Sequence, residues 1–526
     1  MHTTKKNSQR ISNFLWYFII LIYFFSIRNS PLLGSFGFES ANLFILIFAP
    51  FLALWASNSD ESISFIEKII FKYTLALTYI LFLSVLFFIN SFYYKSCSNS
   101  EGFLLFLYML IPSIFLNILF GVIFSFIRNK YIKNSLLFIF YLSYYAYNIY
   151  SWYTNPSFRF YSHLSVIIPS DLVAGSIFNP YIYQFKFSSL LFAACLICFF
   201  SCFYKKSFKL VLSLFFLSIF LCFASFYVQD NALQFLQKTQ LQLKNDYSLV
   251  THKNYITIKA NPSFTSIKKA QNILDEALFW QYRLETRLGI SSNKEIVIWL
   301  HENDEQKFIY TGAKNVHYAL PNRREIHISD SNTPHHVLGH ELAHIYAGEY
   351  SGHFLKMIGD NFIIPNLALT EGVAMYLSSE ENINAYLTMF EQTASLYQIG
   401  IKVDIDKLFS SFNTDFINTN PSVAYLYAGS FLEFALKNSQ EPQKLLQKII
   451  STGSLFKSFE KEYFSQLKNN FIDKLQKPLP AYALKWAKDN FIGESILTKN
   501  CLQDNKKITK YNNKDTKSLY YALKNN

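Results

Sequence analysis

The chain has 526 residues, of which 51% are hydrophobic and 16% charged, and its formal net charge is +12. Residues 1–228 hold 15 basic and 6 acidic residues, a net charge of +9, whereas residues 229–526 hold 33 and 30, a net charge of +3. This length exceeds one ordinary domain, and the composition indicates an apolar first part followed by a soluble second part. Because the excess positive charge belongs to the apolar part, it excludes nucleic acid as an expected partner.

The first part contains seven long apolar runs without an amphipathic period. They cover residues 12–29, 39–57, 69–92, 103–127, 135–153, 188–204 and 209–228. Most reach the ~20 residues that a helix needs to cross a bilayer. The first run is long and bulky and has no small-x-small cleavage site before the second, so it is not a signal peptide. The sequence therefore predicts an α-helical membrane bundle of about seven spans over residues 1–228.

The basic residues near the ends of these runs predict an orientation. Eleven flank the side that holds the N-terminus, against four on the other side. We therefore expect an integral protein of the cell (inner) membrane, with a cytoplasmic N-terminus, the lipid bilayer as a partner, and residues after 228 outside the cytoplasm. None of the seven runs contains histidine or a clear mid-span charge, which disfavours an ion-coupled transporter.

The second part begins with a linker rich in Gln, Asn and Lys at residues 229–252. Its expected elements are strands at 255–260, 295–300 and 324–329 and an amphipathic helix at 264–288, followed mostly by helices to residue 495. We expect the strand at 324–329 to form an edge of the sheet. Strands followed by helices favour an α+β domain over residues 253–495. Residues 496–526 form a Lys/Asn-rich tail.

The sequence TPHHVLGHELAHIYAG, residues 333–348, matches the pattern H-E-x-x-H. Thr333 and Pro334 favour a helix start and Gly348 favours a stop, which predicts a helix of about four turns. His340 and His344 then lie one turn apart, roughly 6 Å along the axis. Both imidazoles can reach a single tetrahedral zinc ion. Glu341 projects beside them, where it can deprotonate a water molecule.

A catalytic zinc ion usually takes three protein ligands. Downstream, PNLALTEGVAMYL, residues 365–377, offers Glu371 on a second helical segment. His353 and Glu349 are the alternatives, although Glu349 is turned away from the ligand face of its helix. We expect His335 and His336 to be exposed or to support the ligands. Ordinary strand or loop positions are expected for the remaining histidines of this region, His301, His317 and His327.

Here the sequence resembles the gluzincin metallopeptidases, in particular the peptidase MA-like domains, over roughly residues 253–440. These families carry H-E-x-x-H on one helix and then a segment like P-x-x-W-L-x-E-G-x-A. The matching residues are Pro365, Leu369, Glu371, Gly372 and Ala374, while Ala368 stands where Trp is common. The resemblance implies a zincin-like fold with Glu371 as the third zinc ligand. His353 does not fit the metzincin spacing, because Ala347 and Tyr350 occupy the positions that metzincins fill with Gly and His.

The resemblance also implies a catalytic tyrosine on the helix AYLYAGSFLEFAL, residues 424–436. Alignment to Tyr-x-x-Ser favours Tyr427, with Tyr425 as the alternative. The expected function is a membrane-anchored zinc-dependent peptidase that holds one Zn²⁺, uses Glu341 as general base, and hydrolyses polypeptides outside the cytoplasm. A catalytically inactive peptidase-like binding module and a transporter with an accessory domain are the alternatives.

Overall fold

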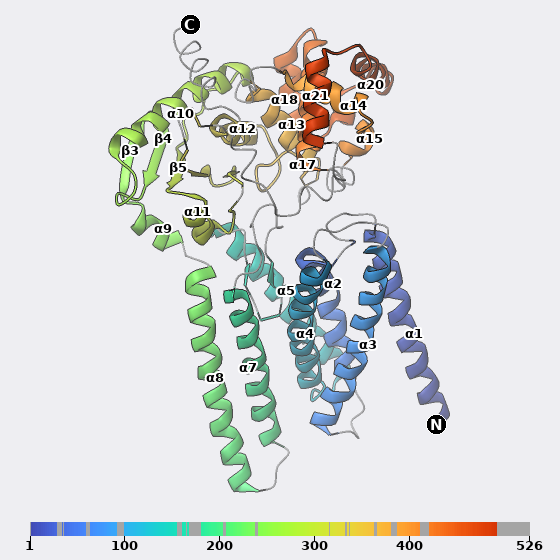
Figure 1. Ribbon diagram of the computed structural model, residues 1–526. Coiled ribbons are helices and arrows are strands. Elements are labelled where there is room, and N and C mark those ends of the chain that lie inside the picture. The colour runs from blue at the N-terminus through green and yellow to red at the C-terminus, as the bar shows by residue number, and fades with distance from the viewer. Residues whose placement is uncertain are drawn as a thin grey trace. The chain divides into compact units, whose positions relative to one another are not determined.

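The computed structural model is shown in Figure 1. It describes residues 2–28, 34, 36–58, 64–91, 99–154, 160–161, 163–164, 166–167, 180–203, 207–236, 240–314, 316–331, 334–335, 337–361, 365–379, 387–410 and 420–491. The chain divides into two compact units, one formed by Met1–Leu243 with Phe308–Val316 and the other by Lys244–Lys307 with His317–Asn526. The division after Leu243 falls inside the expected linker. The expected tail at 496–526 lies outside the described residues.

Long helices dominate the first unit. They are α1 (His2–Ile27), α2 (Phe38–Ser57), α3 (Phe65–Ser91), α4 (Asn99–Phe124), α5 (Lys130–Thr154), α7 (Pro180–Cys202) and α8 (Phe208–Leu236), with a short strand pair of β1 (Phe160–Tyr161) and β2 (Val166–Ile167). Within the described residues, α2, α3, α4, α7 and α8 are long and apolar enough to cross a membrane. These five correspond to five of the seven expected spans, and α1 and α5 are not among them.

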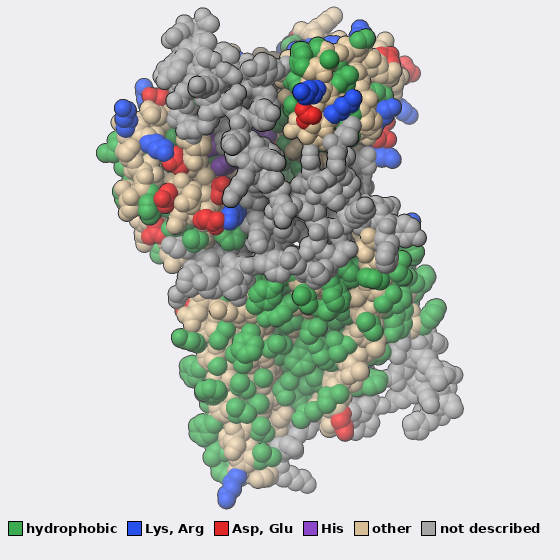
Figure 2. All heavy atoms as spheres, viewed as in Figure 1, with side chains coloured by type: hydrophobic (Ala, Val, Ile, Leu, Met, Phe, Trp, Pro, Cys, Tyr) green, Lys and Arg blue, Asp and Glu red, His purple; other side chains and the backbone are tan. Residues whose placement is uncertain are grey.

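The helices of this unit keep large apolar side chains on their outer surfaces and small residues at their contacts. Phe216, Phe220 and Phe223 of α8 are each more than half exposed, and hydrophobic side chains cover most of the visible surface of the unit (Figure 2). Between α2 and α4, a Cβ on Gly121 would come within 2.2 Å of the carbonyl oxygen of Ala53. Small residues of this kind let two helix backbones approach closely in a bilayer.

One expectation about the spans is wrong. The sixth run was expected to begin at residue 188, but α7 begins at Pro180 and its apolar segment runs from Ile182 to Cys202. Lys186 therefore lies inside a candidate span, and its side chain is fully buried. Its ammonium group donates a hydrogen bond of 2.7 Å to the hydroxyl of Ser113 on α4. Lys186 was one of the four basic residues predicted to flank the spans on the side opposite the N-terminus, because the sixth run was expected to begin after it.

The second unit contains a five-stranded sheet in the order β3-β4-β5-β7-β6. Its strands are β3 (Leu249–Lys253), β4 (Ile256–Ala260), β5 (Ile296–His301), β6 (Tyr318–Leu320) and β7 (Glu325–Ser329). β4, β5 and β7 are parallel, whereas β3 and β6 are antiparallel to their neighbours. The three expected strands are present, but the strand at 324–329 pairs on both sides. The edge beside it is β6, which is only three residues long and was not predicted.

Helix α10 (Ile267–Leu288) follows β4 and packs on the sheet. Its first turn is capped by Ser266, whose side chain accepts a hydrogen bond from the N–H of Lys269, and it ends at Gly289 in the left-handed region, with φ 64°. The end agrees with the expected helix at 264–288, and the start lies three residues later than expected. Apolar side chains of α10, the sheet and the later helices form one continuous core; its members include Ile258, Ala277, Ile298, Leu300, Leu342 and Val373.

The rest of the second part is helical, as its sequence predicted. The remaining helices are α9 (Gln240–Asp246), α11 (Asp304–Thr311), α12 (Leu338–Gly348), α13 (Leu367–Leu377), α14 (Met389–Gln398), α15 (Ile405–Leu408), α17 (Pro421–Lys437), α18 (Pro442–Thr452), α19 (Leu455–Ser458), α20 (Lys461–Leu475) and α21 (Ala481–Phe491). The first part is thus a helical bundle with candidate membrane spans, and the second combines a small mixed sheet with helices. The chain between β7 and α17 holds the residues of the candidate site.

Candidate metal centre

His340 and His344 lie on α12, whose start differs from the expectation. The helix begins at Leu338 and not at Thr333, which lies outside the described residues together with His336. Pro334 and His335 precede the helix, and Val337 is its N-cap without a side-chain hydrogen bond. The helix still includes both histidines of the motif, so their imidazoles lie one turn apart.

Glu371 lies on α13. A cap holds the start of this helix, and one of its sides packs against α17. Asn366 caps the helix by accepting a hydrogen bond from the N–H of Leu369, and its amide group donates to the carbonyl oxygen of Phe409 at 2.9 Å. Next to Glu371, a Cβ on Gly372 would lie 3.0 Å from the carbonyl carbon of Ala428 on α17. The glycine after the glutamate therefore lets α13 and α17 pack closely.

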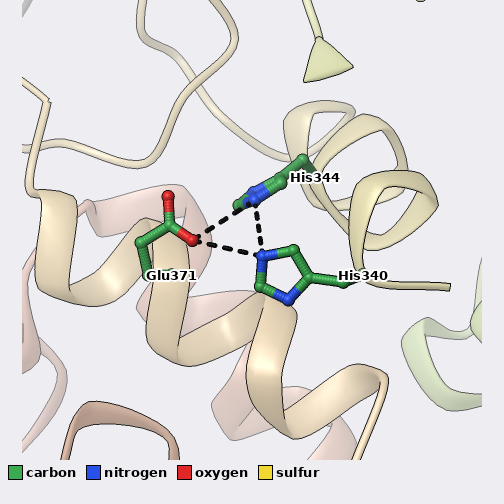
Figure 3. Close-up of side chains that lie close together, drawn as sticks. All are labelled: His340, His344 and Glu371. Carbon is green, nitrogen blue, oxygen red and sulfur yellow. Dashed lines mark hydrogen bonds and ion pairs between the residues drawn. The ribbon is translucent and has the colours of Figure 1, made fainter. Parts of the chain in front are cut away.

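The structure brings His340, His344 and Glu371 together (Figure 3). The Nε2 atoms of the two histidines are 3.2 Å apart, and Oε2 of Glu371 lies 3.2 Å from the Nε2 of His340 and 3.5 Å from that of His344. These three contacts cannot all be hydrogen bonds. If both Nε2 atoms carry protons, the contact between them joins two donors. If one Nε2 atom carries no proton, its contact with the carboxylate joins two acceptors.

A single cation between the three atoms removes this conflict. Ligand atoms about 2.0–2.1 Å from a tetrahedral zinc ion lie about 3.3–3.4 Å from one another. The observed separations of 3.2, 3.2 and 3.5 Å match that value closely. The donor set of two imidazoles and one carboxylate is also one that zinc accepts in catalytic sites, with a fourth position left open. The residues present therefore fit a zinc ion.

The electrostatics of the two glutamates differ. Burial raises the pKa of Glu371, but the charge of His344 and hydrogen bonds from His340 and His344 lower it more, so the pKa ends well below its usual range. Glu371 is therefore a carboxylate, as a metal ligand must be. For Glu341, burial raises the pKa to about 7, and the nearby Glu371 acts in the same direction. Opposing effects come from the charges of His340 and Lys307 and from a hydrogen bond with the backbone of Ala319.

The two candidate tyrosines of α17 point to different surroundings. The hydroxyl of Tyr427 donates a hydrogen bond of 2.6 Å to the carbonyl oxygen of Ile401, away from the three ligands. Tyr425 instead stacks on the ring of His340, with centroids 6.4 Å apart, and shares a hydrogen bond with Glu371. Burial, followed by the charges of Glu371 and Glu341, raises the pKa of Tyr425 well above its usual value. The structure therefore places Tyr425, and not the favoured Tyr427, beside the ligands.

The other histidines that the structure describes in the second part lie outside the three-residue group. His301 and His327 are fully buried and joined by a contact of 3.1 Å, and Tyr247 contacts His301 at 2.6 Å. His335 was expected to be exposed or to support the ligands, and it is fully buried just before α12. His353 is also buried, and its Nδ1 accepts a hydrogen bond from the N–H of Leu355. Glu349, the other alternative ligand, pairs with Lys294 and Arg324.

Two further residues near the site could not be predicted from the sequence. Ala319 belongs to the short strand β6, and its backbone forms a hydrogen bond with Glu341. Glu276 of α10 accepts hydrogen bonds from the backbone N–H of His335. Neither residue belongs to a motif, because both reach the site through contacts between distant parts of the chain.

No family model matches the chain, and comparison with curated proteins found no match.

Proposed function

We propose that the chain is a membrane-anchored zinc metallopeptidase of the gluzincin type. The observation that carries the proposal is the convergence of His340, His344 and Glu371 within a few ångström, with Glu341 on the same helix as the two histidines. These three residues would hold one Zn²⁺. When bound, the ion supplies Lewis acidity that polarises a carbonyl group and makes a water molecule more acidic.

The protein groups around this position suit peptide hydrolysis. Glu341 accepts a proton from the attacking water and delivers it to the leaving amine, and its pKa of about 7 suits both transfers near neutral pH. Tyr425 keeps its phenolic proton because its pKa is raised, so it can donate a hydrogen bond to the oxyanion of the tetrahedral intermediate. An extended polypeptide would bind along β6, the edge strand beside β7.

The same proposal includes the arrangement of the membrane region and the fold class. The proposed bundle has seven spans, with α1 and α5 added to the five apolar helices. The basic residues near the helix ends support a cytoplasmic N-terminus and a peptidase domain outside the cytoplasm. The mixed sheet followed by helices that carry the H-E-x-x-H residues and Glu371 supports a zincin-like α+β domain.

The test is the replacement Glu341→Gln in the full chain, purified in detergent. We expect peptide cleavage to fall by about 10²–10⁴-fold, because a general base is lost. Bound zinc should remain near one ion per chain, since Glu341 is not a ligand. Wild-type protein that binds zinc but cleaves no peptide would support the binding-module alternative. Wild-type protein that binds no zinc would contradict the proposal altogether.

A further inference from the structure

Glu276 is a buried acid that the proposed reaction does not use. It lies on α10 and its side chain is fully buried. Both of its carboxylate oxygens accept the backbone N–H of His335, at 2.8 and 2.9 Å. No basic side chain forms an ion pair with it among the residues that the structure describes. Burial raises the pKa of Glu276 to about 8, against the opposing effect of the hydrogen bond from His335, so the side chain is mostly the neutral acid near pH 7.

His335 extends the contact toward the start of α12. Its Nε2 lies 2.9 Å from the carbonyl oxygen of Ser329, and because a carbonyl only accepts, Nε2 is the protonated nitrogen. Its Nδ1 is therefore an acceptor, and the N–H of Val337 donates to it at 3.4 Å. Val337 is the N-cap of α12 and supplies no side-chain cap of its own. The backbone just before the helix is thus held by Glu276 and by the imidazole of His335.

A second contact one turn along α10 fixes the next part of α12. Trp280 lies against Gly339, where an added Cβ would come within 2.5 Å of the indole ring. Glu276 and Trp280 are four residues apart and so lie on the same face of α10. Together they hold α12 at two points immediately before His340. Ligand side chains need their supporting groups to be placed within about 0.5 Å for a productive geometry.

We propose that Glu276 is a positioning residue, whose carboxyl group holds the backbone at His335 and thereby sets the direction in which α12 presents His340 and His344 to the metal ion. This inference rests on the proposed function, since it assumes that the two histidines bind zinc. It adds a residue that lies 64 positions before the first ligand. Its role depends on the reach of the side chain to His335 and on its ability to accept a hydrogen bond.

Two replacements separate the reach of the side chain from its acidic group. Glu276→Gln keeps the length and one acceptor oxygen but cannot ionise, whereas Glu276→Asp keeps the acidic group but withdraws it by one methylene group. Asp275→Asn, at the exposed neighbouring position on α10, is the matched control. Each variant of the full chain would be titrated with zinc against a competing chelator, with kcat and KM for a peptide and circular dichroism measured alongside.

We expect Glu276→Asp to weaken zinc binding by about 10–100-fold, the range for groups that orient metal ligands, and to lower kcat more than KM. Glu276→Gln should stay within a few-fold of wild type, and Asp275→Asn should match it. If Glu276→Asp binds zinc as tightly as wild type with unchanged kcat, the inference is wrong. It is equally wrong if Glu276→Gln and Glu276→Asp lose zinc affinity to the same extent. A wild-type protein that binds no zinc would instead refute the proposed function.

Discussion

The two units of the chain each bury a polar group, and the groups differ in how their atoms are paired. In the membrane region, Lys186 donates to the hydroxyl of Ser113, the amide of Asn117 donates to the carbonyl of Ser113, and Tyr141 donates to the amide oxygen of Asn117. Every one of these contacts joins a donor to an acceptor. The contacts of this chain are therefore complete as donor–acceptor pairs, and none of the three needs a ligand.

The group formed by His340, His344 and Glu371 is not complete in this sense. Its three atoms face one another at 3.2–3.5 Å, and no assignment of protons turns all three contacts into hydrogen bonds. The comparison contrasts two kinds of buried polar cluster. In the first, the polar atoms pair with one another, whereas in the second they converge in a geometry that fits a cation.

The largest expected effect comes from removing one of the converging acceptors. Glu371→Ala leaves two imidazoles, so zinc affinity should fall by more than the roughly 10–100-fold that is typical for outer-shell partners. Peptide cleavage should be lost with it. Zinc titration of the purified protein measures the first effect and a peptide assay the second.

Glu349→Ala is the matched control, because Glu349 is also a partly buried glutamate close to α12 but pairs with Lys294 and Arg324. Its zinc affinity should equal that of the wild type. Equal zinc binding by Glu371→Ala and wild type would mean that the converging acceptors are not a metal site. The contrast with the Lys186 cluster would then not distinguish a metal site from a paired polar cluster.

The next effect separates the two tyrosines of α17. Tyr425→Phe should lower kcat by about 10²–10³-fold, the loss seen when one oxyanion donor is removed, while zinc content stays the same. Tyr427→Phe should leave kcat unchanged. It should instead lower the free energy of unfolding by about 0.5–1.5 kcal/mol, because the hydrogen bond to Ile401 is lost. Steady-state kinetics and thermal unfolding of both variants test this pair, and the reverse pattern would restore Tyr427 to the catalytic role.

The sequence could predict those parts of the site that depend on local periodicity. The spacing of His340 and His344 is enough to put both imidazoles on one face of a helix, and a second helical segment was predicted around Glu371. The choice between Tyr425 and Tyr427 was not readable in this way. Two positions along a helix differ by about 200° in direction, so the packing of α17 against its neighbours decides which phenol meets the ligands.

Contacts between distant segments explain the other differences. α12 begins at Leu338, five residues later than Thr333, and the backbone at His335 is bonded to Glu276 on another helix. β6 has three residues, too few for an alternating pattern to be recognised, yet it forms the sheet edge that was assigned to residues 324–329. The strands β4, β5 and β7, by contrast, follow from apolar or alternating runs that are visible in the sequence.

The smallest effect is expected in the membrane region. Lys186→Met removes a buried cation whose burial is unfavourable by roughly 2.5–3.5 kcal/mol on insertion scales, and it loses one hydrogen bond to Ser113. The full chain in detergent should therefore unfold at the same or a slightly higher temperature, with unchanged zinc affinity and peptide cleavage.

Lys130→Met, at an exposed position, is the control. If Lys186→Met lowers cleavage while Lys130→Met does not, the cation takes part in function, and the membrane region is more than an anchor. That result would favour a bundle that binds a substrate or an ion, because hydrogen bonds within the bundle alone would not couple Lys186 to peptide cleavage.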